Sequence, residues 1–197
     1  NEPASFNGPL PDDVVFTDED RKTNHAEMHN VYGHLMSKAT YTGLKEQTGK
    51  RPFVITRACY AGSQKYTTVW TGDNQSLWHH LQMVIPQLCN LGMSGFAFCG
   101  TDIGGFGADC TPELLCRWIQ AAMFSPLFRN HAAKGTKDQE PWRFDKEVVD
   151  INRKYIDSHW LIFVVKGLIA IAFGGLALFD MRRDMPTMIS LVGVFLL

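Results

Sequence analysis

The sequence lacks an excess of basic residues: its 19 Lys and Arg and 20 Asp and Glu give 197 residues a formal net charge of −1. Proteins that bind the nucleic-acid backbone carry a clustered basic surplus, which displaces counterions from the phosphates. We therefore exclude nucleic acid as a partner.

Paired C-x-x-C spacing is also missing. The five cysteines are Cys59, Cys89, Cys99, Cys110 and Cys116. An odd number without paired spacing indicates neither a disulfide framework nor a zinc site. We expect buried free thiols in a reducing compartment, which predicts a cytoplasmic location for this part of the chain.

Leader and start signals are not visible either. No positively charged segment followed by a short apolar run opens the sequence, so no secretion signal is predicted. The chain begins at Asn1 without an initiator methionine, and we expect a fragment.

The glycine-rich stretch 100–107 lacks the dinucleotide fingerprint and the P-loop lysine. We expect its glycines to permit tight turns, and we predict no cofactor. A metal site is not predicted either. His29 and His34 lie beside apolar helix positions and are interpreted as structural, while the adjacent His79 and His80 would point about 100° apart on a helix.

What is present is a repeated order of helix, short apolar run and polar loop. Residues 1–24 are rich in Pro, Asn, Gly and Asp and predict a loop. Apolar spacing and end signals such as Gly49 and Thr111-Pro112 predict three helices, at 25–48, 76–91 and 113–123. Short apolar runs predict strands at 51–57, 94–99 and 125–131. Alternation of this kind predicts parallel strands joined by helical crossovers, the α/β class.

Polar residues crowd the carboxyl end of each predicted strand: Arg57 and Asp73 follow the first, Asp102 the second, and Arg129 and His131 the third. A (β/α)₈ barrel assembles its active site at this edge, although an open doubly wound sheet would also bind ligands there. Three units cannot close an eight-stranded barrel. We therefore predict a partial (β/α)₈ TIM barrel if the barrel is the parent fold.

These residues combine acids, cations and flat apolar faces, the last from Trp70, Phe106 and Trp142. Sugars need all three, because their C–H faces stack on rings, their hydroxyls need polar partners, and glycosidic cleavage needs two carboxyls. The alternative is that Asp73 and Asp102 cap helices and the arginines merely pair with them.

Several motifs occur in one order along residues 1–158: Asn1-Glu2-Pro3, His29-Asn30-Val31-Tyr32-Gly33, Arg57, Trp70-Thr71-Gly72-Asp73, Gly100-Thr101-Asp102-Ile103-Gly104-Gly105-Phe106 and Phe128-Arg129-Asn130-His131. In these motifs the segment resembles the catalytic barrel of glycoside hydrolase family 31 α-glucosidases. The resemblance implies a retaining hydrolase that releases terminal α-linked glucose from oligosaccharides. It implies that Asp73 is the general acid/base and that the substrate is bound by Arg57, Trp70, Asp102, Phe106, Arg129 and His131.

The family's nucleophile is the Asp of a D-M-N-E-P motif, and the sequence starts at the Asn of that motif. We do not expect Glu2 to replace it, because two residues along an extended strand move a side chain by about 6.5 Å. Removing a covalent nucleophile costs several orders of magnitude in rate, so the resemblance predicts an inactive chain.

The segment from Trp160 to Phe179 carries one charge, Lys166, and its twenty residues would span about 30 Å as a helix. We therefore predict a transmembrane helix there, a charged turn at 180–186 and a truncated second helix at 188–197, together forming a domain at 159–197. This part weakly resembles HdeD-type acid-resistance membrane proteins. The apolar segment and this resemblance imply that the chain is associated with a membrane and that a lipid bilayer is one of its partners. The alternative function is a small membrane protein carrying an inert hydrolase-derived segment; the oligomeric state stays open.

Overall fold

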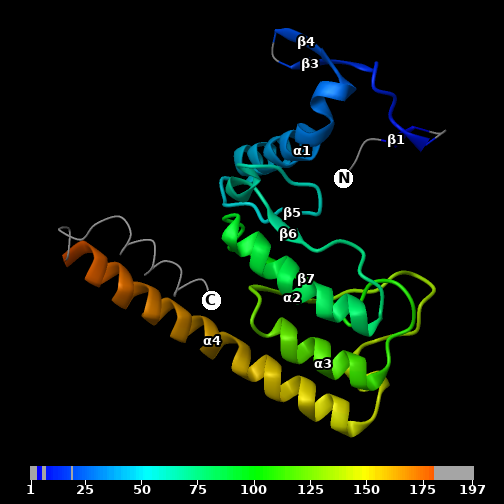
Figure 1. Cartoon of the computed structure of the whole chain (residues 1–197), viewed down its shortest axis with the longest axis vertical. Helices are drawn as coiled ribbons and strands as arrows, with labels where there is room; N and C mark the ends of the chain where they lie inside the picture. The colour runs from blue at the N-terminus through cyan, green and yellow to red at the C-terminus, as the bar shows by residue number, and fades with distance from the viewer. Residues whose placement is uncertain (1–3, 6–7, 19, 180–197) are drawn as a thin grey trace.

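The computed structural model of the protein describes residues 4–5, 8–18 and 20–179 (Figure 1). Its centre is a four-stranded parallel sheet in the order β5 (Ile55–Thr56), β6 (Thr68–Trp70), β7 (Cys99–Ile103) and β8 (Leu127–Asn130). The predicted parallel arrangement is confirmed. The sheet has one strand more than we predicted, because β6 lies in a segment that was expected to be a polar loop.

Three helices connect or precede these strands: α1 (His25–Thr48), α2 (Trp78–Met93) and α3 (Pro112–Ala122). Local caps fix the ends of two of them. The Asn24 side chain accepts from the Glu27 N–H at the start of α1, and Gly49 ends this helix in the left-handed conformation at φ 65°. Thr111 caps α3 by accepting from the Leu114 N–H. The three predicted helices are confirmed to within two residues.

Two short antiparallel hairpins precede α1, β1 (Ala4–Ser5) with β2 (Gly8–Pro9) and β3 (Val15–Asp18) with β4 (Arg21–Asn24). The prediction of a loop over residues 1–24 was therefore wrong for these segments. Val15 and Phe16 have the high strand propensity of β-branched and aromatic side chains, which the turn-forming residues around them outweighed in the prediction.

The hydrophobic core lies where α3 packs on β7 and on the first turns of the C-terminal helix. Leu115 and Trp118 are fully buried, and Ile103 of β7 and Val148 join the same cluster. Complete burial of a side chain such as Leu115 contributes about 1.5–3 kcal/mol. The core therefore anchors β7, the strand that carries Asp102.

Strand β7 begins five residues later than predicted, and Asp102 lies within the strand instead of the loop after it. All five residues of β7 are buried. Gly100 allows β7 to lie close to β8, because a Cβ at this residue would overlap the carbonyl oxygen and the side chain of Leu127 on β8. The sequence pattern did not indicate such a polar buried strand, because Thr101 and Asp102 interrupt its apolar run.

The last helix, α4 (Lys146–Phe179), runs past Ser158 without interruption. It packs on the core through Val148, Ile151 and Tyr155, and in Figure 1 it lies alongside α3. The division of the chain at 158 and 159 into two domains stays a prediction.

Farther along α4, two side chains reach the carbonyl groups that follow α3. His159 Nδ1 lies 3.0 Å from the Met123 carbonyl oxygen, and Lys166 Nζ donates to the Phe124 carbonyl oxygen at 3.2 Å. Carbonyls at a helix C-terminus have no partner within their own helix, and cations are favourable beside them.

The predicted transmembrane helix at 160–179 needs correction. This segment is the C-terminal part of α4, but no helix in the described part of the chain is long and apolar enough to cross a membrane. Its one charge, Lys166, donates to the carbonyl oxygen of Phe124, which follows α3. The second apolar run, 188–197, lies outside the described residues.

Candidate functional site

The side chains predicted to carry chemistry lie at one edge of the sheet, where its parallel strands end. Arg57 follows β5, Asp73 follows β6, and Asp102 and Arg129 occupy paired positions of β7 and β8. His131 comes directly after β8. The predicted gathering of these residues at the carboxyl edge is therefore confirmed.

Asp102 and Arg129 form the buried centre of this edge. Arg129 Nε donates to Asp102 Oδ1 at 2.9 Å, and Arg129 Nη2 donates to the same oxygen. The other carboxylate oxygen, Oδ2, is buried and has no hydrogen-bond partner among the described residues. The Arg129 guanidinium also lies over the ring of Trp70, 5.1 Å from its centroid. Trp70 Nε1 is a second buried polar atom without a described partner.

The electrostatics of Asp102 follow from its burial. Burial raises the pKa of the Asp102 carboxyl above its ordinary value, and the hydrogen bonds and charge of Arg129 oppose this rise. The charge of His131 lowers the pKa of Asp102 and the charge of Asp73 raises it. These two influences place Asp73 and His131 within electrostatic reach of the buried carboxylate.

Asp73 is more accessible than Asp102. Its Oδ2 accepts from Arg57 Nη1 at 2.9 Å, and the two side chains are 47% and 38% exposed. An ion pair this exposed contributes about 0–1 kcal/mol to stability. The pair therefore does little to hold the fold, and it leaves a carboxylate open to solvent beside a guanidinium.

The loop that carries Asp73 is fixed to the glycine-rich loop after β7. The Asn74 carbonyl oxygen accepts from Phe106 N at 2.6 Å, and Ser76 N donates to the Gly107 carbonyl oxygen at 2.7 Å. Gly105 allows this approach, because a Cβ there would lie 2.5 Å from Ser76 N. Gly105 therefore serves a close backbone contact that was not predicted, while the predicted tight turn is seen in the φ of 89° at Gly104 and 91° at Gly105 and in the bond from Gly105 N to the Asp102 carbonyl oxygen at 3.0 Å.

Phe106 and His131 stack with ring centroids 5.2 Å apart, which brings the glycine-rich loop against the end of β8. A buried residue that the sequence did not reveal supports this contact. The Gln139 side-chain amide donates to the carbonyl oxygens of Ile103 and Gly105, both at 3.1 Å, and to Asn130 Oδ1 at 2.9 Å. A single glutamine in a polar loop gives no sequence signal for this role.

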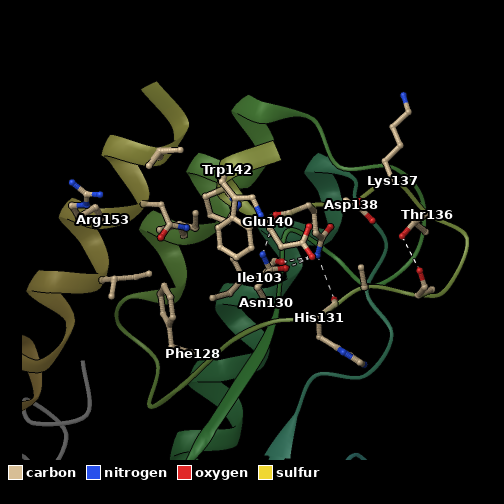
Figure 2. Close-up of a pocket in the computed structure, with 18 of the residues that line it drawn as sticks. Ile103, Phe128, Asn130, His131, Thr136, Lys137, Asp138, Glu140, Trp142 and Arg153 are labelled. Carbon is tan, nitrogen blue, oxygen red and sulfur yellow. Dashed lines mark hydrogen bonds between the residues drawn. The ribbon is translucent and has the colours of Figure 1, made fainter. Parts of the chain in front are cut away.

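Two pockets flank the site. Arg57, Trp70 and Gly72 line one of about 510 Å³, between the ends of β5 and β6 and the last turns of α2. The other, of about 780 Å³, lies beside β8 and α4. His131 lies at one end of this larger pocket, with the side chains of Glu140 and Trp142 over its centre (Figure 2). The predicted residues thus converge at one edge. Arg57 and Trp70 line the smaller pocket and His131 and Trp142 the larger one, while the side chains of Asp73, Asp102, Phe106 and Arg129 line neither of these two pockets.

Metal-binding groups were not predicted. Among the residues that the structure describes, no three His, Cys, Asp or Glu side chains are grouped so that they could hold a metal ion.

Comparison with known proteins matches most of the chain. The sequence model for the TIM-barrel domain of glycosyl hydrolases family 31 matches residues 1–160. Alpha-glucosidase 2 of Bacillus thermoamyloliquefaciens is 52% identical over 160 residues, which make up 79% of this chain and 20% of that protein. The chain thus spans about a fifth of the length of this curated relative.

Solved structures of related enzymes also match this chain. A family 31 α-glucosidase from Bacteroides thetaiotaomicron matches with a TM-score of 0.65 and 42% identity over 73% of this chain and 25% of that chain. The glucosidase II alpha subunit, bound to Glc1Man2, matches with a TM-score of 0.71 and 38% identity over 79% of this chain and 17% of that chain. These comparisons do not show the expected resemblance of residues 159–197 to HdeD-type proteins.

Proposed function

The chain belongs to glycosyl hydrolase family 31, and from this premise we propose that it supplies the general acid/base and the sugar-contacting side chains of a retaining α-glucosidase. The proposed substrate is a terminal α-linked glucose unit of an oligosaccharide. Asp73 is the proposed acid/base. The proposed sugar contacts are Arg57, Trp70, Asp102, Phe106, Arg129 and His131.

The observation that carries the proposal is the unsatisfied Oδ2 of Asp102. A buried carboxylate oxygen without a partner costs free energy, which a ligand hydroxyl would recover by donating a hydrogen bond. Trp70 Nε1 is a buried donor in the same cluster. A sugar hydroxyl both donates and accepts, so it complements the pair.

The alternative is that Asp102 only neutralises Arg129. That role accounts for Oδ1, which accepts both hydrogen bonds from the guanidinium, but it leaves Oδ2 without a use. The same alternative accounts fully for Asp73, whose Oδ2 pairs with Arg57. Asp102 therefore distinguishes the two interpretations better than Asp73 does.

In the proposed mechanism, Asp73 protonates the glycosidic oxygen while the family's second carboxylate attacks the anomeric carbon. Asp73 then removes a proton from the water that releases glucose. Its exposed position suits both steps, because it must exchange a proton with the leaving group and with water. Arg57 beside it can pair with the carboxylate between these steps and donate to a sugar hydroxyl.

Binding is tested on the 197-residue chain with 1-deoxynojirimycin, a glucose-like iminosugar, by following the Trp70 indole N–H in NMR spectra. We expect a saturable shift of this signal, and loss of binding in Asp102→Asn. Asp109→Asn is the matched control, because Asp109 also pairs with a cationic side chain, Lys137, at 3.7 Å, but is exposed and lines neither pocket. Binding that survives Asp102→Asn, or is lost equally in the control, would contradict the proposed contact.

Turnover is tested with residues 1–160 placed at the matching position of Alpha-glucosidase 2. Because general acid catalysis contributes about 10²–10⁴-fold, we expect Asp73→Asn to lower the rate on maltose by that factor. Hydrolysis of an activated aryl glucoside should fall much less, since its leaving group needs little protonation. Equal loss on both substrates would rule out the acid/base role.

The cytoplasmic location predicted from the free cysteines stays a prediction. One solved relative is described as an ER glucosidase II complex, so family membership does not fix a compartment.

A further inference from the structure

We propose that Ser63, together with His34 of helix α1, is a positioning pair that sets the direction of Arg57 in the site. This inference rests on the proposed function in one respect, the sugar-contacting role of Arg57. The geometry of the pair itself is independent of that function.

Arg57 lies at the carboxyl edge of the sheet, where its Nη1 donates to Asp73 Oδ2 at 2.9 Å. It is 38% exposed, and it follows a strand of only two residues, β5. The direction of its guanidinium therefore depends on the backbone of the segment that follows as well as on the ion pair with Asp73. This segment, residues 58–62, leads into the short helix η1 (Ser63–Lys65).

The first contact that holds this segment is with α1. Gly33 of α1 lies so close to Ala58 that an added Cβ would be 2.5 Å from the Ala58 Cβ and 2.9 Å from its carbonyl oxygen. On the other side, Thr56 Oγ1 accepts from Ala58 N at 3.2 Å. The residue next to Arg57 is thus fixed between α1 and the end of β5.

The second contact is the fully buried hydroxyl of Ser63. Ser63 Oγ accepts from Tyr60 N at 2.9 Å, and Ser63 N donates to the Tyr60 carbonyl oxygen at 3.0 Å. These bonds close the turn from both directions. His34 Nδ1 lies 2.9 Å from Ser63 Oγ.

The donor in the bond between His34 Nδ1 and Ser63 Oγ follows from the other bond that this hydroxyl makes. The Ser63 oxygen already accepts from Tyr60, and its buried hydroxyl proton needs an acceptor. His34 Nδ1 supplies it, so the ring proton resides on Nε2. The His34 ring also packs against Tyr66 at 5.7 Å between centroids, and its Cε1 lies 3.5 Å from where a Cβ of Gly62 would be. The histidine, which the sequence indicated as structural, thus connects α1 to the C-terminal end of the segment 58–62, while Gly33 contacts its other end at Ala58.

The test uses the 197-residue chain and the NMR signal of the Arg57 guanidinium, assigned by its loss in Arg57→Lys. In the parent chain we expect a shifted signal, because Nη1 donates to Asp73. In Ser63→Ala and His34→Leu it should move to the position of a free arginine. In His34→Asn it should stay near the parent position, because the amide oxygen can replace Nδ1 as the acceptor.

Ser125→Ala is the matched control. Ser125 is also buried and its Oγ donates to the carbonyl oxygens of Ala122 and Leu127, far along the chain from Arg57. It should lower stability to a similar extent without moving the Arg57 signal. An unchanged signal in Ser63→Ala, or an equal change in Ser125→Ala, would overturn the proposal.

A second readout separates this proposal from the proposed function. If the chain binds 1-deoxynojirimycin, affinity should fall about tenfold or more in Ser63→Ala and recover in His34→Asn relative to His34→Leu. If affinity falls equally in His34→Asn and His34→Leu, the acceptor role of His34 is refuted. If the parent chain binds no iminosugar, the proposed function fails, while the Arg57 signal still decides whether the pair positions this residue.

Discussion

Helix α1 contains two glycines whose replacement by alanine should have opposite effects on stability. Gly33 is buried against Ala58, whereas an added Cβ at Gly43 would have nothing within 4 Å. Both lie inside the same helix, where Gly is about 1 kcal/mol less favourable than Ala. Gly43→Ala should therefore raise the free energy of unfolding by about 0.5–1 kcal/mol.

Gly33→Ala gains the same helix propensity but meets Ala58. Carbon atoms in contact lie about 3.5–4.0 Å apart, so the separation of 2.5 Å from the Ala58 Cβ is roughly 1.0–1.5 Å too short. The carbonyl oxygen of Ala58, at 2.9 Å, belongs to the backbone and cannot rotate away. Overpacking of this kind costs about 1–3 kcal/mol. Since the propensity gain is common to both variants, their difference in stability measures the steric cost directly.

The assay is equilibrium unfolding in urea, with equal slopes required for the comparison. We expect Gly33→Ala to be less stable than Gly43→Ala by about 1–3 kcal/mol. Adding Ala58→Gly should reduce this difference only in part, because it removes the Cβ contact and leaves the carbonyl contact. A difference below about 0.5 kcal/mol, comparable to the error of such cycles, would refute the close packing of α1 on the Arg57 segment.

Two further predictions concern buried titratable groups. Burial raises the pKa of the Cys110 thiol to about 12, and the neighbouring Cys116 contributes to this rise. A disulfide reagent at pH 8 should therefore label the exposed Cys89 in the native chain, and Cys110 only after unfolding. Peptide mass spectrometry checks which cysteine carries the label, and Cys89→Ser should remove the label from that peptide; Cys59, which is partly exposed, is followed separately. Native labelling of Cys110 would contradict the buried core. For Asp102 the folded pKa is raised, so the native state keeps this proton at pH values where the unfolded chain, with a pKa of about 3.9, has lost it. The contribution of Asp102 to stability should therefore fall as pH rises from about 3.9 through the folded pKa. The stability of Asp102→Asn relative to the parent chain should rise over the same pH range. If this relative stability falls instead, the direction of the Asp102 pKa shift is contradicted.

The sequence by itself determined the features that depend on neighbouring residues. Asn24 and Gly49 bound α1, and Thr111 with Pro112 starts α3, because a cap acts on backbone groups within one turn. The alternation of helices and short apolar runs also determined the parallel sheet, and with it the edge where Asp73, Asp102 and His131 gather.

Only the tertiary structure decided the features that depend on distant segments. Strand β7 carries a polar Asp102 in a fully buried position because Arg129, 27 residues away, supplies its partner. The segment at Thr68–Trp70 becomes a strand because it pairs with neighbours on both sides. His34 meets Ser63 across 29 residues. Local propensity acts over a few residues, whereas the pairing that satisfies a buried polar group is chosen by the packing of the whole chain.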